Sequence, residues 1–257
     1  MDILRKELDA IYAGQHLDRE TLDAGMLATA LSKAKAYSEV NNGCCVITDA
    51  SADRCYIMGG SFCRLLGLSD TDSLYDEADS SDEDAIYMRL HPEDLADKRM
   101  LEYDFFKYID PLPGEEKLKY KATCKIRVRN NYGEYMAVSN STQVIQSSPG
   151  GKIWLILCCY DLAPDQQQCD GISPRIVNNS TGEIISIPAD ERRKNVLTQR
   201  EKEILRLIQQ GKPSKQIASQ LNISIHTVNR HRQNIIGKLS VGNTVEAIMA
   251  ATMMRLL

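Results

Sequence analysis

A window of closely spaced helix start and stop signals, Leu197–Leu257, constrains the fold of this chain more than any other feature. Thr198 can accept a hydrogen bond from the amide of Glu201, and the Glu201 side chain can bond back to the Thr198 amide, an arrangement that starts many helices. Apolar residues then recur at helical spacing until Gly211, a residue that commonly follows the end of a helix. Short helices of this kind must pack together, because each has one apolar stripe to bury.

Two further helices are predicted to meet at a tight turn inside this window. Ser214 is expected to cap the first, the turn follows at Asn222–Ser224, and Ser224 caps a longer helix whose inward stripe includes Val228 and Ile235. Two helices joined in this way, the second with polar residues on its outer face, have the geometry that fills a DNA major groove. The sequence therefore predicts an all-α domain of four helices that contains a helix-turn-helix.

The same residues resemble the LuxR/NarL-type DNA-binding domain. The positions that match in order and spacing are Leu197, Thr198, Arg200, Glu201, Gly211, Ile217, Ala218, Leu221, Ser224, Thr227, Val228, His231, Lys238 and Leu239. Two positions depart from the common pattern: Asn229 stands where lysine is frequent, and Thr244 stands where an arginine often precedes the last helix. The first departure affects base preference, and the second removes a usual salt-bridge partner.

This resemblance places base contacts at Asn229, Arg230 and Gln233. The chemistry agrees, because arginine can present two donors to a guanine edge, and asparagine or glutamine can pair with adenine. Phosphate contacts, which position the protein without reading sequence, are predicted for Lys215, Ser224, Thr227, His231 and Lys238. The alternative for any one of these residues is a polar side chain that is only solvated.

The last predicted helix, Val245–Leu256, has apolar residues along one side. The related domain often uses this helix for pairing, so dimerisation is predicted at Val245, Ile248, Met249 and Thr252. The alternative is that this side completes the core of the domain, and both uses can coexist. A two-fold pair predicts an inverted-repeat DNA site.

Length and charge describe a two-domain chain with a basic end. The 257 residues suffice for two ordinary domains, each with its own core. The segment from Asp190 onward holds twelve Lys and Arg against five Asp and Glu, a net charge of +7, whereas the rest carries −11 and the whole chain −4. A basic module on an acidic body suits one domain that meets DNA phosphates and one that avoids them.

Neither a membrane segment nor a disulfide framework is predicted. The longest apolar run, Ile153–Tyr160, is far shorter than the roughly 20 residues that span a bilayer. The N-terminus lacks the apolar stretch of a signal peptide. The eight cysteines include two adjacent pairs in strand-like runs and no Cys-x-x-Cys, which favours reduced, buried thiols. We therefore expect a cytoplasmic protein without a membrane partner.

Four segments are expected along the chain. Residues 1–40 form an N-terminal helical segment of two helices, which could pack as a hairpin on the next domain or on a second copy. Residues 41–162 form a sensor-like domain, residues 163–196 a linker that contains a small hairpin, and residues 197–257 the DNA-binding domain. The fold class is therefore α+β, an antiparallel-sheet domain followed by the all-α domain.

The sheet of the sensor-like domain is predicted from short apolar runs bounded by turn residues. Three long antiparallel strands are expected at Tyr120–Arg129, Glu134–Ile145 and Ile153–Asp161, after an earlier hairpin that begins at Cys44. The acidic stretch Ser69–Asp84 is expected to be a solvated loop.

This order of elements resembles a PAS domain. The residues that carry the resemblance are Ile47–Asp49, Phe62–Gly67, His91–Asp94, Tyr132–Tyr135 and Tyr160–Asp161. The resemblance implies a ligand pocket or an interaction surface, without naming a ligand.

No catalytic, metal or cofactor site emerges from the body of the chain. Cys63 lies in a stretch that faintly echoes the photoactive flavin motif, but Phe62 and Gly67 replace the asparagine and glutamine of that motif. His91 precedes Pro92 at a helix start, which is more typical of a capping or surface histidine than of a haem ligand. Zinc spacing, a phosphate-binding glycine loop, a Gly-x-Ser-x-Gly turn and a phosphoreceiver aspartate set are all absent from the sequence. A non-enzyme is predicted, with no metal site and an unknown cofactor.

Three functions remain open on the sequence. The leading hypothesis is a transcription regulator in which the PAS-like domain senses a small molecule or a protein and the last domain binds double-stranded promoter DNA as a homodimer, with RNA polymerase as a further candidate partner. The second is a ligand- or partner-binding PAS protein with incidental DNA affinity. The third is a sigma-factor-like polymerase subunit, which would require a long helical region upstream of the helix-turn-helix.

Overall fold

A computed structural model describes residues 3–81, 83–167, 171–185, 197–239, 241–253 and 256–257. Apart from the first three residues, the chain divides into two compact units, Leu4–Ile187 and Pro188–Leu257. In the described ranges, no helix combines the length and the apolar character that crossing a bilayer requires. The expected α+β class is confirmed, because one unit is built on an antiparallel sheet and the other is helical.

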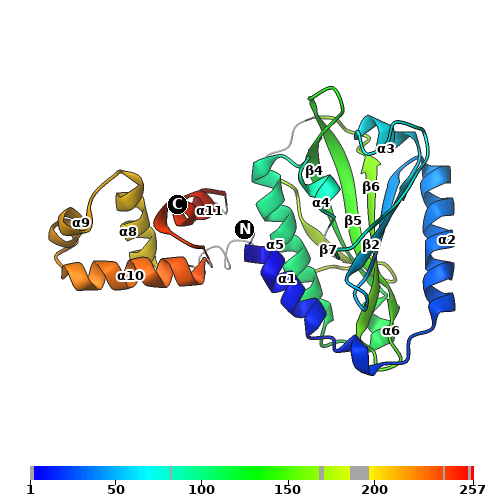
Figure 1. Cartoon of the computed structure of the whole chain (residues 1–257), viewed down its shortest axis with the longest axis horizontal. Coiled ribbons are helices and arrows are strands. Elements are labelled where there is room, and N and C mark those ends of the chain that lie inside the picture. Colours follow the sequence, from blue (N-terminus) through cyan, green and yellow to red (C-terminus); the bar gives the residue numbers. More distant parts are fainter. Residues whose placement is uncertain (1–2, 82, 168–170, 186–196, 240, 254–255) are drawn as a thin grey trace. The chain divides into compact units, whose positions relative to one another are not determined.

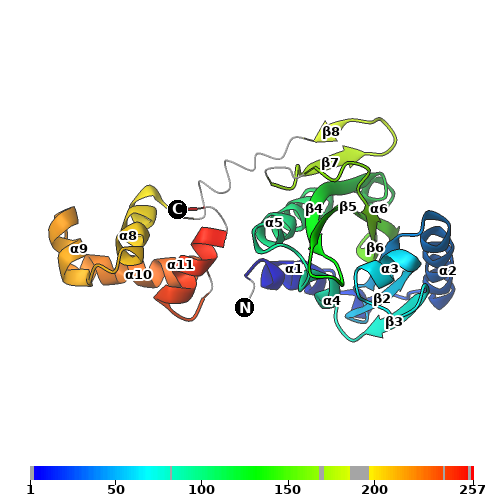
Figure 2. The ribbon, with the colours of Figure 1, turned by 90° about the horizontal axis from the view of Figure 1, so that it is seen from above.

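The described residues of the first unit form one eight-stranded sheet with the spatial order β3-β2-β1-β6-β5-β4-β7-β8 (Figures 1 and 2). Every neighbouring pair is antiparallel. The strands are β1 Cys44–Asp49, β2 Arg54–Gly59, β3 Leu74–Ala78, β4 Tyr120–Arg129, β5 Tyr135–Ser147, β6 Ile153–Leu162, β7 Arg175–Asn178 and β8 Ile184–Ile185. The predicted long strands β4, β5 and β6 are confirmed within two residues at each end.

Helices cover the sheet on both faces (Figure 1). They are α1 Ile3–Ala13, α2 Ala24–Asn41, α3 Ser61–Leu65, α4 Asp84–Tyr87, α5 Pro92–Ile109 and α6 Gly114–Lys117, with a single 3-10 turn at Leu17–Arg19. One face packs against α1 and α5 through residues such as Leu8 and Phe105, and we call it the inner face. The opposite, outer face packs against α2 through Ala34. Strand β1 is buried at every position because helices lie over both of its faces.

The first two helices therefore do not form the hairpin that the sequence suggested, since they lie on opposite faces of the sheet (Figure 1). The second helix starts at Ala24, capped by the Asp23 carboxylate, which accepts a hydrogen bond from the Gly25 amide at 2.8 Å. The acidic stretch is also not a simple loop. Its centre forms β3, which pairs with β2 at the edge of the sheet.

The hairpin predicted in the linker is present and continues the sheet. Strand β7 pairs with β4, and β8 pairs with β7 (Figure 2). Ile176 of β7 is 1% exposed and belongs to the core of the inner face. The backbone of the segment before β7 is also attached, since the amide of Lys125 donates to the carbonyl of Ile172 at 2.8 Å. The described residues 171–185 are thus part of the sheet unit.

The second unit contains four described helices, α8 Gln199–Gln209, α9 Ser214–Leu221, α10 Ile225–Lys238 and α11 Thr244–Met253. Its core is a separate apolar cluster of Leu197, Ile204, Leu205, Leu207, Ile217, Ala218, Val228, Ile235, Leu239, Ala247, Ala251 and Leu256. The predicted four-helix domain is confirmed. The capping box at its start is also confirmed, because Thr198 and Glu201 exchange both hydrogen bonds.

Candidate functional site

The tight turn between α9 and α10 is built by Asn222 and Ser224. Asn222 ends α9 in the left-handed conformation with φ of 53°, which asparagine tolerates better than most residues. The Ile223 amide then donates to the carbonyl of Ala218 at 3.0 Å. The Ser224 hydroxyl accepts from the Thr227 amide at 3.0 Å and so caps α10, as predicted. These bonds hold α9 and α10 as a helix-turn-helix.

Ser214 does not cap α9 as the sequence suggested. The N-cap is Pro213, and Ser214 occupies the first helical position. Its hydroxyl instead donates to Asn229 Oδ1 at 3.1 Å and accepts from Arg232 Nη1 at 3.0 Å. The side chain therefore joins α9 to α10 rather than starting α9.

The outer face of α10 carries the three residues predicted to contact bases. Asn229, Arg230 and Gln233 are all exposed, on the side opposite the buried residues Val228 and Ile235. Asn229 is oriented by its bond to Ser214. The structure thus brings the three side chains together on one accessible helix face.

The five predicted phosphate contacts lie in different surroundings. Lys215 is exposed on α9, and Ser224 and Thr227 lie at the start of α10, where the free amides of a helix favour anions. His231 is half-buried, and its Nδ1 is buried without a hydrogen-bond partner, so a phosphate would have to bind at Nε2. Lys238 already pairs with Glu201 inside the domain.

Lys238 joins the end of α10 to the capping box of α8. Its Nζ lies 2.7 Å from Oε2 of Glu201, a side chain that is 2% exposed. The same oxygen accepts from the Thr198 amide at 2.7 Å and from the Thr198 hydroxyl at 2.9 Å. Burial acts to raise the pKa of Glu201, but the bonds from Lys238 and Thr198 outweigh it and hold this pKa below its usual value. Glu201 is a charged anchor between two helices.

Arg232 is a positioning residue that sequence reasoning missed. Its guanidinium bonds to Ser214 of α9 and, through Nη2, to the Thr244 hydroxyl of α11 at 3.1 Å. Thr244, which departs from the family pattern, therefore supplies an acceptor in place of a salt bridge. The sequence does carry a signal for this contact. Arg232 lies four residues after the inward-facing Val228, and residues with this spacing share one side of a helix.

The last helix separates the residues predicted for dimerisation. Val245 is 68% exposed and Met249 is 61% exposed, and Thr252 is exposed on the same side. Ile248 is half-buried and packs against the core of the domain. The core side of α11 is formed by Ala247, Ala251 and the following Leu256 rather than by the apolar side that the sequence suggested.

A sequence model of the "Bacterial regulatory proteins, luxR family" matches residues 195–251. Those residues contain the capping box and the helix-turn-helix described above. Residues 195–251 are a LuxR-family helix-turn-helix domain. The matched family consists of regulatory proteins and not of enzymes.

Curated relatives match this LuxR-family domain, and three of them illustrate the similarity. The response regulatory protein YgeK of Escherichia coli strain K12 is 50% identical over 60 residues, 23% of this chain and 41% of the relative. DesR of Bacillus subtilis strain 168 is 48% identical over 54 residues, 21% of this chain and 27% of the relative. NarL of Escherichia coli strain K12 is 46% identical over 57 residues, 22% and 26% of the two chains. The chain thus spans less than half the length of these relatives, all within its last domain.

Solved structures also show a distant likeness that extends over most of the chain. A Vibrio cholerae VqmA dimer in the absence of target DNA aligns over 88% of both chains, with 17% identity and a TM-score of 0.31. Escherichia coli SdiA aligns over 98% of this chain and 97% of that chain, with 14% identity and a TM-score of 0.26. Because both TM-scores are low, these two structures define neither the ligand nor the assembly of this chain.

The sheet unit that precedes the LuxR-family domain holds charged residues in its interior. Lys98 of α5 is fully buried and its ammonium group pairs with Glu102, which also accepts from the Tyr87 hydroxyl at 2.6 Å. Burial acts to lower the pKa of Lys98, but Glu102 together with Cys158, Cys124 and Glu83 outweighs it, and the pKa is raised. Glu83 accepts from Tyr160, and burial raises the pKa of Glu83 despite the opposing effect of Lys98.

This buried cluster leaves little empty space. Oε2 of Glu102 is buried without a hydrogen-bond partner, and a cavity of about 20 Å³ lies beside the cluster. Such a cavity has room for roughly one water molecule. Among the described residues, no group of three His, Cys, Asp or Glu side chains could hold a metal ion.

Two other sequence expectations concern single residues of this unit. His91 caps α5, since its Nδ1 accepts from the Glu93 amide at 3.3 Å. Cys63 is fully buried in the core of the inner face. The seven described cysteines are all buried and none of them is joined in a disulfide, in agreement with the expected reduced thiols.

Proposed function

We propose that this protein is a sequence-specific transcription regulator whose LuxR-family domain reads promoter DNA and whose sheet unit, a PAS-like sensor domain, receives the signal. The observation that carries the proposal is α10 of the LuxR-family domain, which presents Asn229, Arg230 and Gln233 on one exposed face. The net charge of +7 from Asp190 onward supports the approach of this face to phosphates. The DNA lies in the cytoplasm, so the proposal places the protein there.

Pairing of two copies is part of the proposal. Val245 and Met249 are large apolar side chains that stay exposed on α11, and an isolated helical domain gains by covering them. A two-fold pair of LuxR-family domains would present two copies of α10 to successive turns of the duplex, and would therefore select an inverted repeat.

The sheet unit suits a sensor better than the body of a polymerase subunit. It is built on an eight-stranded sheet in the described residues, whereas a sigma-factor-like chain requires a long helical region before its helix-turn-helix. The order of strands and short helices supports the PAS-like assignment that the sequence suggests. Strands β7 and β8, which come last in the sheet unit along the chain, extend the same sheet.

DNA selection followed by mobility-shift titration tests the proposal. The full chain is expected to enrich one sequence from a random pool and to bind it with a strong salt dependence. Arg230→Ala should lose about 1–3 kcal/mol of discrimination between the selected site and single-base variants of it. Lys215→Ala should instead weaken all sequences alike and reduce the salt slope by about one unit.

The matched control is Arg206→Ala, which removes an exposed arginine of α8 that no prediction assigns to DNA. It should leave both discrimination and salt slope near those of the unmodified protein. Binding without any sequence preference would refute the proposal and favour the alternative, a ligand- or partner-binding protein with incidental DNA affinity.

A further inference from the structure

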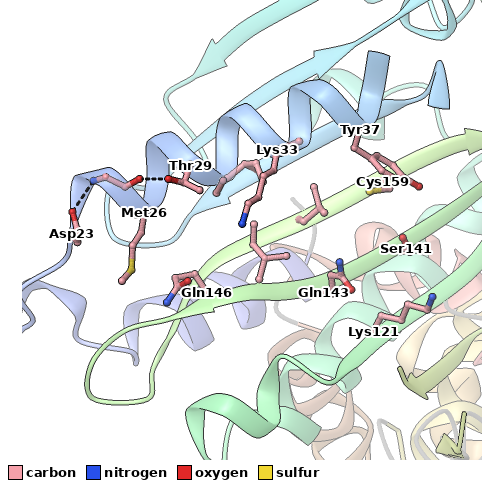
Figure 3. A pocket seen from close by; sticks show the side chains of 16 residues that line it. Asp23, Met26, Thr29, Lys33, Tyr37, Lys121, Ser141, Gln143, Gln146 and Cys159 are labelled. Carbon is pink, nitrogen blue, oxygen red and sulfur yellow. Dashed lines mark hydrogen bonds between the residues drawn. The ribbon is translucent and has the colours of Figure 1, made fainter. Parts of the chain in front are cut away.

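A groove of about 840 Å³ lies between α2 and the outer face of the sheet (Figure 3). Its walls are α2 on one side and strands β4, β5 and β6 on the other. Its volume is in the range of roughly 300–1,000 Å³ that is typical of sites for small molecules. A second hollow of the described sheet unit, beside α3, has about 440 Å³, and the interior cavity has about 20 Å³, so the groove offers more room for a ligand than either.

The walls of the groove carry two lysines without partners among the described residues. Lys33 comes from α2 and points toward the strands, and Lys121 comes from β4 (Figure 3). By contrast Lys125, which lies on the same face of β4 as Lys121, pairs with Asp165 at 3.3 Å. The one carboxylate that lines the groove in the described chain, Asp23, is already used as the cap of α2. The groove therefore has an uncompensated positive charge, although it belongs to the acidic part of the chain.

The floor of the groove is apolar, and its rim carries neutral polar groups. Buried or half-buried side chains of Ala34, Ile47 and Leu157 form the floor. The amides of Gln143 and Gln146 stand on β5 (Figure 3). An apolar floor takes up hydrocarbon, and ammonium groups beside amide donors bind a carboxylate by charge-assisted hydrogen bonds.

We propose that this groove is a ligand site for an amphipathic carboxylate, with the hydrocarbon part on the apolar floor and the carboxylate between Lys33 and Lys121. The proposal rests on the proposed function, because such a molecule would be the signal that the sheet unit receives. Lys121 pairs with Val177 of β7 in the sheet, so the carboxylate would be held next to the strands that follow the long hairpin.

Charge favours this occupant over a second copy of α2. The exposed charged residues of that helix are Lys33 and Lys35 against Glu39, and the facing strands contribute Lys121. Two such helices brought together over this groove would add positive charge to positive charge. An anion of low molecular weight removes the repulsion instead.

Isothermal titration calorimetry on the full chain without DNA tests the proposal, with straight-chain carboxylates as probes. Octanoate and decanoate, used below their micelle-forming concentrations, are expected to bind with one site per chain. Affinity should rise about fourfold for each added CH₂, the fold-change that corresponds to about 0.8 kcal/mol. Decyltrimethylammonium, which has a chain of the same length and the opposite charge, should bind much more weakly.

Two substitutions locate the site. Lys33→Met and Lys121→Met keep an apolar stem and remove one charge each, so each should weaken decanoate binding by about tenfold. The matched control is Lys35→Met, which removes an exposed lysine of α2 outside the groove and should leave the affinity unchanged.

Equal binding of the cationic and anionic probes would overturn the proposal, as would wild-type affinity in both Lys33→Met and Lys121→Met. A change of oligomeric state in these variants, measured by sedimentation, without any decanoate binding by the unmodified chain would assign the groove to a second copy instead. The DNA-selection experiment contains no carboxylate, and the calorimetry contains no DNA, so the two experiments test the two proposals independently. Failure of the ligand proposal therefore leaves the DNA-binding proposal intact, and failure of DNA selection leaves the groove measurable.

Discussion

The bond network around Glu201 yields a quantitative prediction for the stability of the LuxR-family domain. One buried carboxylate oxygen accepts three hydrogen bonds, two from Thr198 and one from Lys238. Glu201→Gln retains the shape and an acceptor but removes the charge. Hydrogen bonds to a charged group are worth about 1.5–3 kcal/mol and neutral ones about 0.5–1.5 kcal/mol.

We expect Glu201→Gln to lower the free energy of unfolding of this domain by about 1–2 kcal/mol. The figure is below the sum of the three differences, because the Lys238 side chain is 40% exposed and water screens its ion pair. For a domain of this size, 1 kcal/mol shifts the melting temperature by about 4–8 °C. The expected shift is therefore about 4–16 °C downward.

Circular dichroism of the full chain at a helix wavelength would follow this transition. The sheet unit is followed separately by fluorescence, because the single tryptophan, Trp154, is buried in that unit. Its transition should not move. The matched control is Glu203→Gln, which removes an exposed carboxylate that pairs with Arg200 and should change the stability by less than about 0.5 kcal/mol.

The stability difference between the unmodified protein and Glu201→Gln should depend on pH in a direction that the pKa of Glu201 predicts. Because the pKa of Glu201 is lowered by folding, the charge contributes stability that is complete above the unfolded pKa of about 4.3. That contribution disappears as the pH falls through the lower folded pKa. The difference between the unmodified protein and Glu201→Gln should thus be full at pH 7 and shrink in acid. An equal stability difference at pH 7 and in acid, or a melting-temperature shift confined to Trp154 fluorescence, would refute the reasoning.

Three further predictions concern other parts of the chain. Lys98→Met removes the ammonium partner of the buried Glu102 carboxylate and leaves Arg99, at 4.0 Å, as the cation beside it. The urea midpoint followed by Trp154 fluorescence should therefore fall by the equivalent of about 3–5 kcal/mol, and an unchanged midpoint would contradict the buried pair. Ile176→Ala should cost the sheet unit about 2–5 kcal/mol and speed amide hydrogen exchange in β7, and a neutral result would mean that β7 does not contribute to the core. Met249→Asp should abolish pairing in sedimentation experiments and weaken binding to an inverted repeat but not to a half-site; unaltered pairing would exclude α11 from the dimer interface.

Features that depend on neighbouring residues could be predicted from the sequence. The capping box of Thr198 and Glu201 and the cap at Ser224 involve residues three positions apart, so their bonds follow from local geometry. The long strands β4 and β5 were predicted because side chains alternate between two environments with a period of two. The exposure of Arg230 follows from helical periodicity, because a residue two positions after the inward-facing Val228 lies on the other side of the helix.

Features that depend on which surface an element meets could not be predicted. The charged stretch around β3 becomes an edge strand because β2 offers it an unpaired backbone, which no local pattern records. Val245 and Met249 were expected on the same apolar side as Leu256, but the alanines of α11 fit closer to the neighbouring helices and take the buried positions.

The sequence alone determined the helix-turn-helix, because caps, turn residues and helical periodicity all act over a few positions of one short window. Tertiary structure decided where that window obtains its rigidity and where the sheet unit has room for a ligand. Glu201 and Lys238 lie far apart in the sequence, and Lys33 and Lys121 come from opposite walls of the groove. A charge acquires its role from the groups that folding places beside it: Lys238 meets a buried carboxylate, and Lys33 and Lys121 meet none among the described residues.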